Sequence, residues 1–320
     1  MTTLKNQSAK PSWFTRFWAI VRYEILWNIR KKLFISVLIL AFIFSSLNII
    51  LPLLFNFNEN PYFAMTFSAG SITFFLFAIV TGMNTISGEY EKGTIVPLLT
   101  KPVSRTMVFL GKLFAIFLII LVTYVILYAY SIIGGMLVYG PQENLQFVPL
   151  AFIGDIISTF IWVSIVLAIG ALSKNTLLTV LVTFGLFVAL LIAVPVISVF
   201  SDNPGVLNYV PGSGASGTLN ISGGANITIT GNVTVNTLTG ISTGTDSIGI
   251  NLAKLALYPN SNASFFYTDP LQLDSPEPPR FLYTDSLSLI AGRSIGIAFT
   301  YMAVFLFIAW LTFKRSQILE

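Results

Sequence analysis

Long apolar blocks separated by polar stretches dominate the chain, and six of these blocks are long enough to cross a membrane. They cover residues 33–55, 63–87, 113–138, 147–172, 176–200 and 286–313. A hydrocarbon core of roughly 30 Å needs about 20 apolar residues in a helix, because every backbone amide in lipid must be hydrogen-bonded within its own segment. The pattern therefore predicts an all-α polytopic membrane protein with six transmembrane helices.

The stretch between the fifth and sixth blocks, residues 201–285, follows a different pattern. It is rich in Gly, Ser, Thr and Asn, and apolar and polar residues alternate at 227–230 and 233–235. This period of two around Gly231 and Asn232 predicts a β-hairpin with a two-residue turn. Aromatic residues and prolines return after Phe265 and indicate short interfacial elements. We expect a small β-rich insertion between the fifth and sixth spans.

Ahead of the first block, residues 12–30 predict an amphipathic helix. Its apolar side chains recur at helical spacing: Phe14, Phe17, Trp18, Val21, Ile25 and Ile29. Arg16, Tyr23 and Arg30 fall on the opposite side, which suits a helix lying in the membrane interface. One interpretation is an anchoring helix. The other is that it also supports a cytoplasmic partner, for which Glu24 is one of the few available acids.

The basic residues set the orientation of the chain. Lys and Arg gather in the N-terminal segment, in the connections after the second and fourth blocks, and in the C-terminal tail. The short connections on the other side hold Glu59 and Glu143 and no basic residue, and residues 201–285 hold only Lys254 and Arg280. Cytoplasmic segments retain positive charge. We therefore expect a multi-pass protein of the cell membrane with both termini in the cytoplasm and the β-rich insertion outside.

Composition removes several classes of function. Only 9% of the residues are charged and 55% are hydrophobic, whereas soluble domains carry about 25% charged residues. Cysteine and histidine are absent, which excludes Ser-His and Cys-His catalysis and His-ligated zinc or haem. We expect no catalytic residue, no metal, no directly bound cofactor and no nucleic-acid partner.

Two features inside the apolar blocks carry candidate roles. Asp155 lies about a third of the way into the fourth block, where an ionised carboxylate costs on the order of 2.5–3.5 kcal/mol. It should face protein or water, either as part of a transport pathway or in a structural hydrogen bond. Gly292 and Gly296 permit close helix packing in the sixth block.

Four Asn-x-Ser/Thr triplets lie in the predicted outer stretch. They begin at Asn220, Asn226, Asn232 and Asn262, and each is a candidate glycosylation site. Sequence rich in Ser and Thr also produces such triplets by chance. Glycosylation at these positions would indicate a eukaryotic or archaeal surface protein, and the absence of cysteine favours the archaeal alternative.

The connection after the second block is unusual because acids occur where basic residues would suffice. It reads Ser-Gly-Glu-Tyr-Glu-Lys-Gly-Thr from residue 87, and Gly93 and Pro102 bracket a short apolar stretch at residues 95–99. Such a stretch is long enough for one or two helical turns. It is suited to docking in a groove of a soluble protein, or alternatively forms a solvated connector whose apolar residues rest on lipid.

This connection resembles that of the type-2 ABC transporter permeases. There it typically reads Ser-Gly-Glu, a variable residue, Glu-Lys-Gly-Thr, a leucine-rich turn, Lys-Pro-Val-Ser-Arg, and Gly-Lys at the next span. The matching positions are Glu89, Glu91, Lys92, Gly93, Thr94, Leu98, Leu99, Pro102, Ser104, Arg105, Gly111 and Lys112. Val96 and Pro97 depart from the pattern, which often has an acid followed by leucine, so the coupling helix is expected to start at Pro97. The six spans, the interfacial helix and the large outer segment are also similar to this family.

The resemblance implies a permease that couples to a separate ABC ATPase and forms a translocation pathway as a homo- or heterodimer, working as an exporter. ATP and Mg²⁺ would bind to the partner. The chain lacks a phosphate-binding loop of its own, because Lys112 is followed by Leu113 and the first glycine is replaced by Thr106. The alternatives are a secondary transporter and a multi-span anchor that presents an adhesion or sensor domain.

These expectations divide the chain into four parts. Residues 1–32 form the cytoplasmic interfacial helix, and residues 33–200 form five transmembrane helices with the coupling loop at 87–112. Residues 201–285 form the outer β-rich segment. Residues 286–320 form the sixth transmembrane helix and a cytoplasmic tail.

Overall fold

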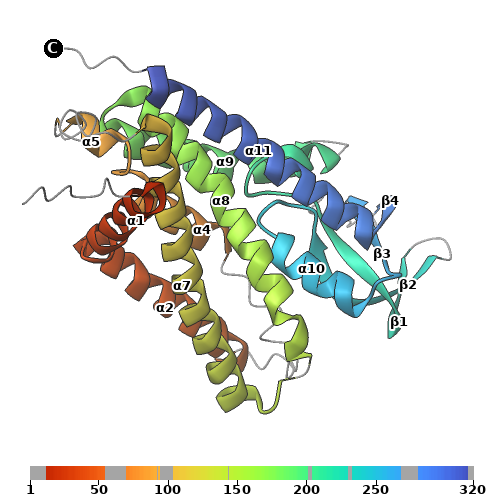
Figure 1. The fold of residues 1–320 in the computed structure, drawn as a ribbon. Coiled ribbons are helices and arrows are strands. Elements are labelled where there is room, and N and C mark those ends of the chain that lie inside the picture. Colours follow the sequence, from red (N-terminus) through yellow and green to blue (C-terminus); the bar gives the residue numbers. More distant parts are fainter. Residues whose placement is uncertain are drawn as a thin grey trace, which may run out of the picture.

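The computed structural model describes residues 12–54, 70–91, 93, 104–142, 144–200, 204–229, 233–267 and 280–315. Their arrangement is mainly helical, with one small sheet at the end of the molecule farthest from α1 (Figure 1). In chain order the elements are α1 (Trp13–Ile29), α2 (Lys32–Leu54), α4 (Gly70–Gly82), α5 (Ser87–Glu91), α7 (Arg105–Tyr139), η1 (Leu145–Phe147), α8 (Val148–Ser173), α9 (Thr176–Phe200), η2 (Pro204–Tyr209), β1 (Ser216–Ile229), β2 (Val233–Ser242), α10 (Ile248–Leu257), β3 (Asn262–Tyr267), β4 (Arg280–Ser286) and α11 (Leu287–Arg315).

Six candidate spans occur among the described residues, by length and apolar composition, as the apolar blocks predicted. They are α2, the pair α4 and α5, α7, α8, α9 and α11. The third span begins earlier than expected, at Arg105 instead of residue 113. The hydroxyl of Ser104 caps it by accepting a hydrogen bond from the Met107 amide at 3.2 Å. Lys112, which the apolar pattern placed outside the span, therefore lies two turns inside the helix.

Helix α8 is the centre of the helical bundle. It packs against α4, α9, α10 and α11 (Figure 1), and most of its side chains are buried, including Trp162, Val163 and Val166. From α9, Phe187 stacks on Phe75 of α4 with ring centroids 4.0 Å apart. Most other side chains of α9 point outward and are apolar. Apolar side chains exposed in this way would be unfavourable in water, but they are not unfavourable in contact with lipid tails.

The sheet is antiparallel, with strand order β2-β1-β3-β4. The predicted hairpin is confirmed by the antiparallel pairing of β1 with β2, in which Ile229 lies opposite Val233. Its predicted two-residue turn lies outside the described residues. Part of the stretch after Phe265, where interfacial elements are expected, forms the paired strands β3 and β4, and its location at the membrane interface stays a prediction. The strands could not be predicted from the prolines and aromatic residues, because backbone pairing between distant segments leaves no local sequence pattern.

Helix α10 was not predicted, and it changes the character of the insertion. We call residues 204–286 the sheet segment. Its core includes the first turn of α11 as well as the strands: Ala215, Leu219, Ile241, Ala263, Phe265, Leu287 and Ile290. On its other side α10 packs along α8. The sheet segment is therefore attached to two spans and does not stand apart from the bundle.

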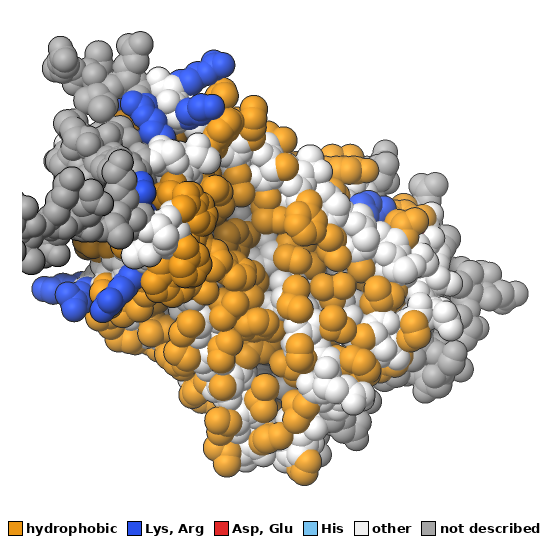
Figure 2. Space-filling model, viewed as in Figure 1, with side chains coloured by type: hydrophobic (Ala, Val, Ile, Leu, Met, Phe, Trp, Pro, Cys, Tyr) orange, Lys and Arg blue, Asp and Glu red, His pale blue; other side chains and the backbone are white. Residues whose placement is uncertain are grey.

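The surface is divided between a basic end and a broad apolar face. In Figure 2 the Lys and Arg side chains gather mainly at the end where α11 finishes, while hydrophobic side chains cover most of the face between that end and the sheet segment. We call the end that contains α1, α5 and the last turn of α11 the basic end. The sheet segment lies at the opposite end (Figure 1).

Candidate functional site

A buried cluster of three charged side chains joins α1, α5 and α7 at the basic end. The Lys112 ammonium lies 2.5 Å from Glu24 Oε1 and 2.7 Å from Glu89 Oε1. The side chains of Lys112 and Glu24 are 3% and 5% exposed, and that of Glu89 is 14% exposed. Buried ions need opposite charges in good geometry, because desolvation is costly. One ammonium therefore holds two carboxylates from different helices.

Close packing of α1 on α7 places Glu24 beside Lys112. A Cβ added at Gly111 would lie 3.0 Å from Ile20 Cγ2, so the glycine lets the two helices approach. Val21, Glu24 and Asn28 are buried on one side of α1, as the spacing of three and four residues along a helix requires. The sequence-based hypothesis that Glu24 serves a cytoplasmic partner does not fit this position, because the residue is 4% exposed and its Oε1 pairs with Lys112.

Three consecutive residues of α5 contact three different spans. Glu89 binds Lys112 of α7. The Tyr90 ring packs edge-on against Phe313 of α11, with centroids 6.4 Å apart. Glu91 Oε2 accepts a hydrogen bond from the Thr176 amide at 3.2 Å, which puts a negative charge at the first residue of α9, where the helix dipole favours it. Consecutive side chains of a helix point about 100° apart, so one turn reaches all three neighbours.

Both ends of the connection between the second and third spans are anchored. At one end Gly93 has φ +65°, a left-handed conformation that follows α5 and that glycine adopts without strain. At the other end the Arg105 guanidinium donates to the Lys314 carbonyl at 3.1 Å, where a cation suits the C-terminal end of α11. The connection is thus tied to the first residues of α7 and α9 and to the last turn of α11.

The residues expected to couple to an ATPase are only partly described. Glu89, Glu91 and Arg105 contact the chain's own helices, and Gly93 is exposed. The remaining candidates lie outside the described residues: Lys92, Thr94, Leu98, Leu99 and Pro102. The sequence reasoning missed the contacts of Tyr90 and the pairing of Lys112 with two acids. The pairing of Lys112 could have been suspected from the sequence. Lys112 follows the helix-capping Ser104 by eight residues, so it lies within the third span and needs a counter-charge.

Asp155, the candidate pathway residue, is 1% exposed within α8 and faces protein. The Tyr128 hydroxyl of α7 donates to Asp155 Oδ2 at 2.6 Å. The Thr159 hydroxyl donates to the Asp155 carbonyl at 2.8 Å and lies 2.5 Å from the Tyr124 hydroxyl. This geometry agrees with the structural hydrogen bond that the sequence left open beside a pathway role.

In the sheet segment, Lys254 of α10 is a buried cation. Its ammonium donates to the Gly240 carbonyl at 2.6 Å, and the residue is 6% exposed. Burial disfavours the charged form and lowers the pKa of Lys254 from 10.5 to about 8. The backbone carbonyl supplies a dipole but no full negative charge.

The predicted glycosylation acceptors fall on the sheet. Asn220 and Asn226 are residues of β1, and Asn262 is the first residue of β3. Asn232 lies outside the described residues. Glycosylation of these positions stays a prediction.

A comparison with protein families covers almost the whole chain. The family model described as ABC-2 family transporter protein matches residues 18–318. This range includes all six candidate spans, the sheet segment and most of α1. No curated protein matches the sequence.

Proposed function

The chain belongs to the ABC-2 family of transporter proteins, and on that basis we propose that it is the permease subunit of an ATP-driven exporter, coupled to a separate ATPase through residues 87–105. The partner ATPase binds ATP and Mg²⁺ and carries out hydrolysis. This chain contributes the membrane pathway and no catalytic residue, as a homodimer or paired with a related permease.

The observation that carries this proposal is the set of contacts around α5. Force applied to the connection beyond Glu91 reaches α7 through Glu89, α11 through Tyr90 and α9 through Glu91. A solvated connector needs none of these contacts. A connection that must move several spans together needs all of them, because displacement passes only through packed or ion-paired groups.

The mechanism follows from these links. Closure of the ATPases presses on residues 94–103, and the displacement enters the bundle at α5. The ion pairs to Lys112 make α1 move with α5 and α7. Helix bundles switch between discrete packings rather than deforming continuously, so the pathway alternates between facing the cytoplasm and facing outward.

The orientation proposed from the basic residues is part of the same assignment. The basic end faces the cytoplasm, where positive charge is retained and where an ATPase is available, and both chain termini are cytoplasmic. The sheet segment then lies on the outer side. The sheet segment is attached to α8 and α11. This attachment favours a role in transport for the sheet segment over a role as an adhesion or sensor domain presented by a membrane anchor.

The test is purification of the full chain from membranes in which an ABC ATPase is also produced. The native chain should bring down the ATPase and raise its ATP turnover. The double variant Leu98→Asp/Leu99→Asp should lose the ATPase, because charge would replace the apolar stretch expected at the contact. Glu91→Lys should keep the ATPase but weaken the dependence of turnover on the permease, because the link to α9 is broken.

Val206→Asp is the matched control. Val206 is 52% exposed in η2, within the sheet segment, and charging it should leave ATPase binding at the native level. Equal ATP turnover with the native chain and the Leu98/Leu99 variant would contradict the assignment. So would a native chain that binds no ATPase.

A further inference from the structure

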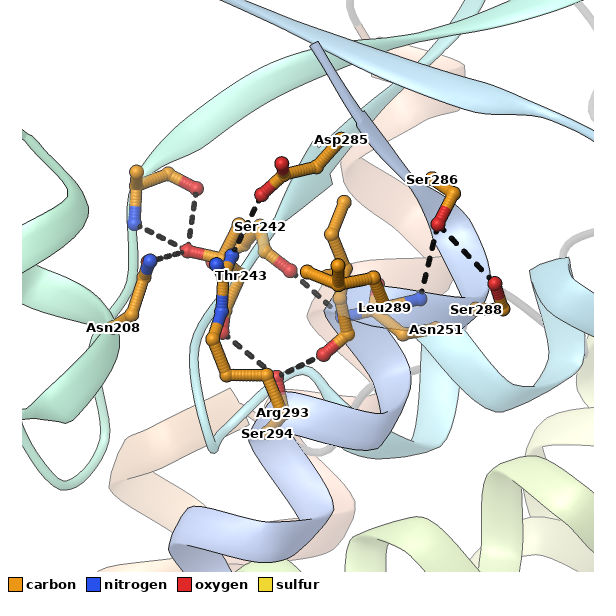
Figure 3. Close-up of polar contacts among 12 residues, drawn as sticks. Asn208, Ser242, Thr243, Asn251, Asp285, Ser286, Ser288, Leu289, Arg293 and Ser294 are labelled. Atoms are coloured by element: carbon orange, nitrogen blue, oxygen red, sulfur yellow. Dashed lines mark hydrogen bonds and ion pairs between the residues drawn. The ribbon is translucent and has the colours of Figure 1, made fainter. Parts of the chain in front are cut away.

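The sheet segment is attached to the bundle in two different ways, and the first attachment is to α11. Strand β4 runs directly into this helix at Ser286 and Leu287. The Ser294 hydroxyl donates to the Thr243 carbonyl at 2.8 Å, and Arg293 pairs with Asp285 at 3.1 Å (Figure 3). Thr243 also donates through its hydroxyl to Asn208. Covalent continuity, a shared core and these polar contacts make α11 and the sheet segment one body.

The second attachment, to α8, has no covalent continuity. The backbones of α8 and α10 meet at two glycines: a Cβ on Gly154 would overlap the Gly249 Cα, and a Cβ on Gly249 would lie 2.5 Å from the Ala151 carbonyl oxygen. Next to them the Ser158 hydroxyl donates to the Thr245 carbonyl at 2.6 Å. A backbone contact this close leaves little room for sliding.

Asp155 lies at the centre of the α8 attachment. Its Oδ1 atom lies against Gly249, the second residue of α10, so that a Cβ there would overlap the carboxylate oxygen. The N-cap residue of α10, Ser247, gives the helix no side-chain hydrogen bond. The structure gives Asp155 Oδ1 no hydrogen bond to an α10 amide, so its favourable interaction with this helix N-terminus is with the helix dipole. Asp155 thus supplies the negative charge that α10 does not supply itself.

The contact lies along α8, which is part of a candidate membrane span. Asp155 is the eighth residue of α8, which places it about 10 Å along the helix from its start. Helix α10 therefore lies alongside the first turns of α8 instead of beyond the end of that helix. Tyr128, whose hydroxyl donates to the other carboxylate oxygen, adds α7 to the same contact.

We propose that Asp155 is a positioning residue that latches the first turn of α10 onto α8, and that the transport cycle opens this contact while the attachment to α11 stays closed. The latch itself follows from the contacts of Asp155. Its opening rests on the proposed transport function. Because the sheet segment moves with α11, a change in the angle between α8 and α11 alters the contact between α8 and α10 as well as the direct packing of α8 on α11.

The chain contains no cysteine, so cysteine pairs can be introduced without removing native ones. The latch pair is Ser158→Cys/Thr245→Cys, and the control pair is Thr243→Cys/Ser294→Cys. Each pair replaces a contact between a serine hydroxyl on a span and a backbone carbonyl of the sheet segment. All four positions are at most 2% exposed. The measurement is therefore the rate of direct disulfide formation driven by molecular iodine, a small oxidant that enters membranes, in membranes containing the full chain.

In the resting protein both pairs should crosslink. Asp155→Asn removes the charge with little change in shape. It should shift the equilibrium between the closed and the open contact toward the open one by roughly five- to tenfold, the range that loss of a buried charge-dipole interaction of about 1–1.4 kcal/mol gives, and this shift should slow crosslinking of the latch pair. The control pair should keep its native rate. An unchanged rate for the latch pair in the Asp155→Asn background would overturn the latch, and slowing of both pairs would show that Asp155 supports the whole fold instead.

The second measurement repeats the crosslinking with the ATPase held in a vanadate-trapped state. Latch crosslinking should fall and control crosslinking should stay unchanged. If neither rate changes while ATP turnover still depends on the permease, the opening step is wrong although the proposed function stands. If no ATPase binds the chain, the proposed function and the opening step fail together, and the first measurement still decides whether Asp155 is a latch.

Discussion

Buried carboxylates are stabilised differently at the two ends of the molecule. At the basic end Glu24 and Glu89 share the full positive charge of Lys112. Toward the sheet segment Asp155 is met by the Tyr128 hydroxyl and by the first turn of α10. Full charges bind strongly but leave a large penalty when one partner is removed. Dipoles bind less strongly, and their loss is cheaper.

The difference suits what each end has to do. The contact at the basic end must transmit displacement without coming apart, and three charges on three helices achieve this. The contact with α10 is proposed to open and close in every cycle. A contact based on one carboxylate, a hydroxyl and a helix N-terminus is suited to that, because its strength is within the range that nucleotide-driven motion can overcome.

Removal of the shared cation should have the largest effect. Lys112→Met leaves two buried carboxylates without their counter-charge, and we expect it to lower the free energy of unfolding by about 3–5 kcal/mol. An SDS titration of the purified chain in mixed micelles measures this loss. The triple variant Glu24→Gln/Glu89→Gln/Lys112→Met removes all three charges and should recover most of the stability. A stable Lys112→Met single variant would show that the cluster does not hold the basic end together.

Lys254 is a buried cation whose partner among the described residues is a backbone carbonyl dipole and not a full negative charge. Its pKa in the folded chain is about 8, against 10.5 for the ordinary side chain. Between these values the unfolded chain binds more protons, so stability should rise as the pH increases from about 8 to 10.5, by roughly 3 kcal/mol at most. Below this range the cost of burying the charge is fully present.

Lys254→Met should remove this rise, which can be measured by unfolding titrations of both chains across that pH range. Other groups titrate there, so the informative quantity is the difference between variant and native chain. Lys32→Met changes an exposed lysine and should leave the pH profile unaltered. A rise of equal size in Lys254→Met would show that other groups cause it.

Closing the space between α8 and α10 should have the next largest effect. Gly249→Ala places a Cβ 2.5 Å from the Ala151 carbonyl oxygen and closer still to the Asp155 carboxylate, and overpacking of this kind costs about 1–3 kcal/mol. Thermal unfolding followed by tryptophan fluorescence measures the loss. Gly185→Ala, in α9, meets nothing within 4 Å and should be neutral or slightly stabilising. Equal stability of the two variants would mean that α10 is free to move away from α8.

The smallest effect is expected at Glu91, which is exposed and interacts with a helix N-terminus. Glu91→Gln keeps a hydrogen-bond acceptor but removes the charge, and exposed charges of this kind contribute about 0.3–1 kcal/mol. The same SDS titration should show a small loss that shrinks as salt is added. A loss as large as that of Lys112→Met would remove the distinction between the buried cluster and its exposed neighbours.

The sequence predicted the spans well but predicted the sheet segment poorly. Apolar blocks reveal spans because the lipid solvent acts on each segment separately. The hairpin at 227–235 was predicted, but α10 and the pairing of β3 with β4 were missed. Strand pairing and the packing of α10 on α8 depend on partners distant in the sequence, which a local pattern does not contain.

The candidate site shows the same division. The motif at residues 87–105 pointed to Glu89, Glu91 and Arg105, and all three have interactions at the basic end. The partners of these residues were not predictable, because each lies on another helix. Asp155 was singled out as a costly buried charge, but its contact with Gly249 emerged only when α10 was placed against α8.

From its sequence alone, this chain was determined to be a six-span protein with a basic end and a transporter-like connection after the second span. These properties depend on residue type and order, because solvent and membrane charge act on each segment locally. Only the tertiary structure decided which charges meet: Glu24 and Lys112 are 88 residues apart in the chain. The cost of desolvation forces buried charges to find partners, but helix packing selects which partners they find.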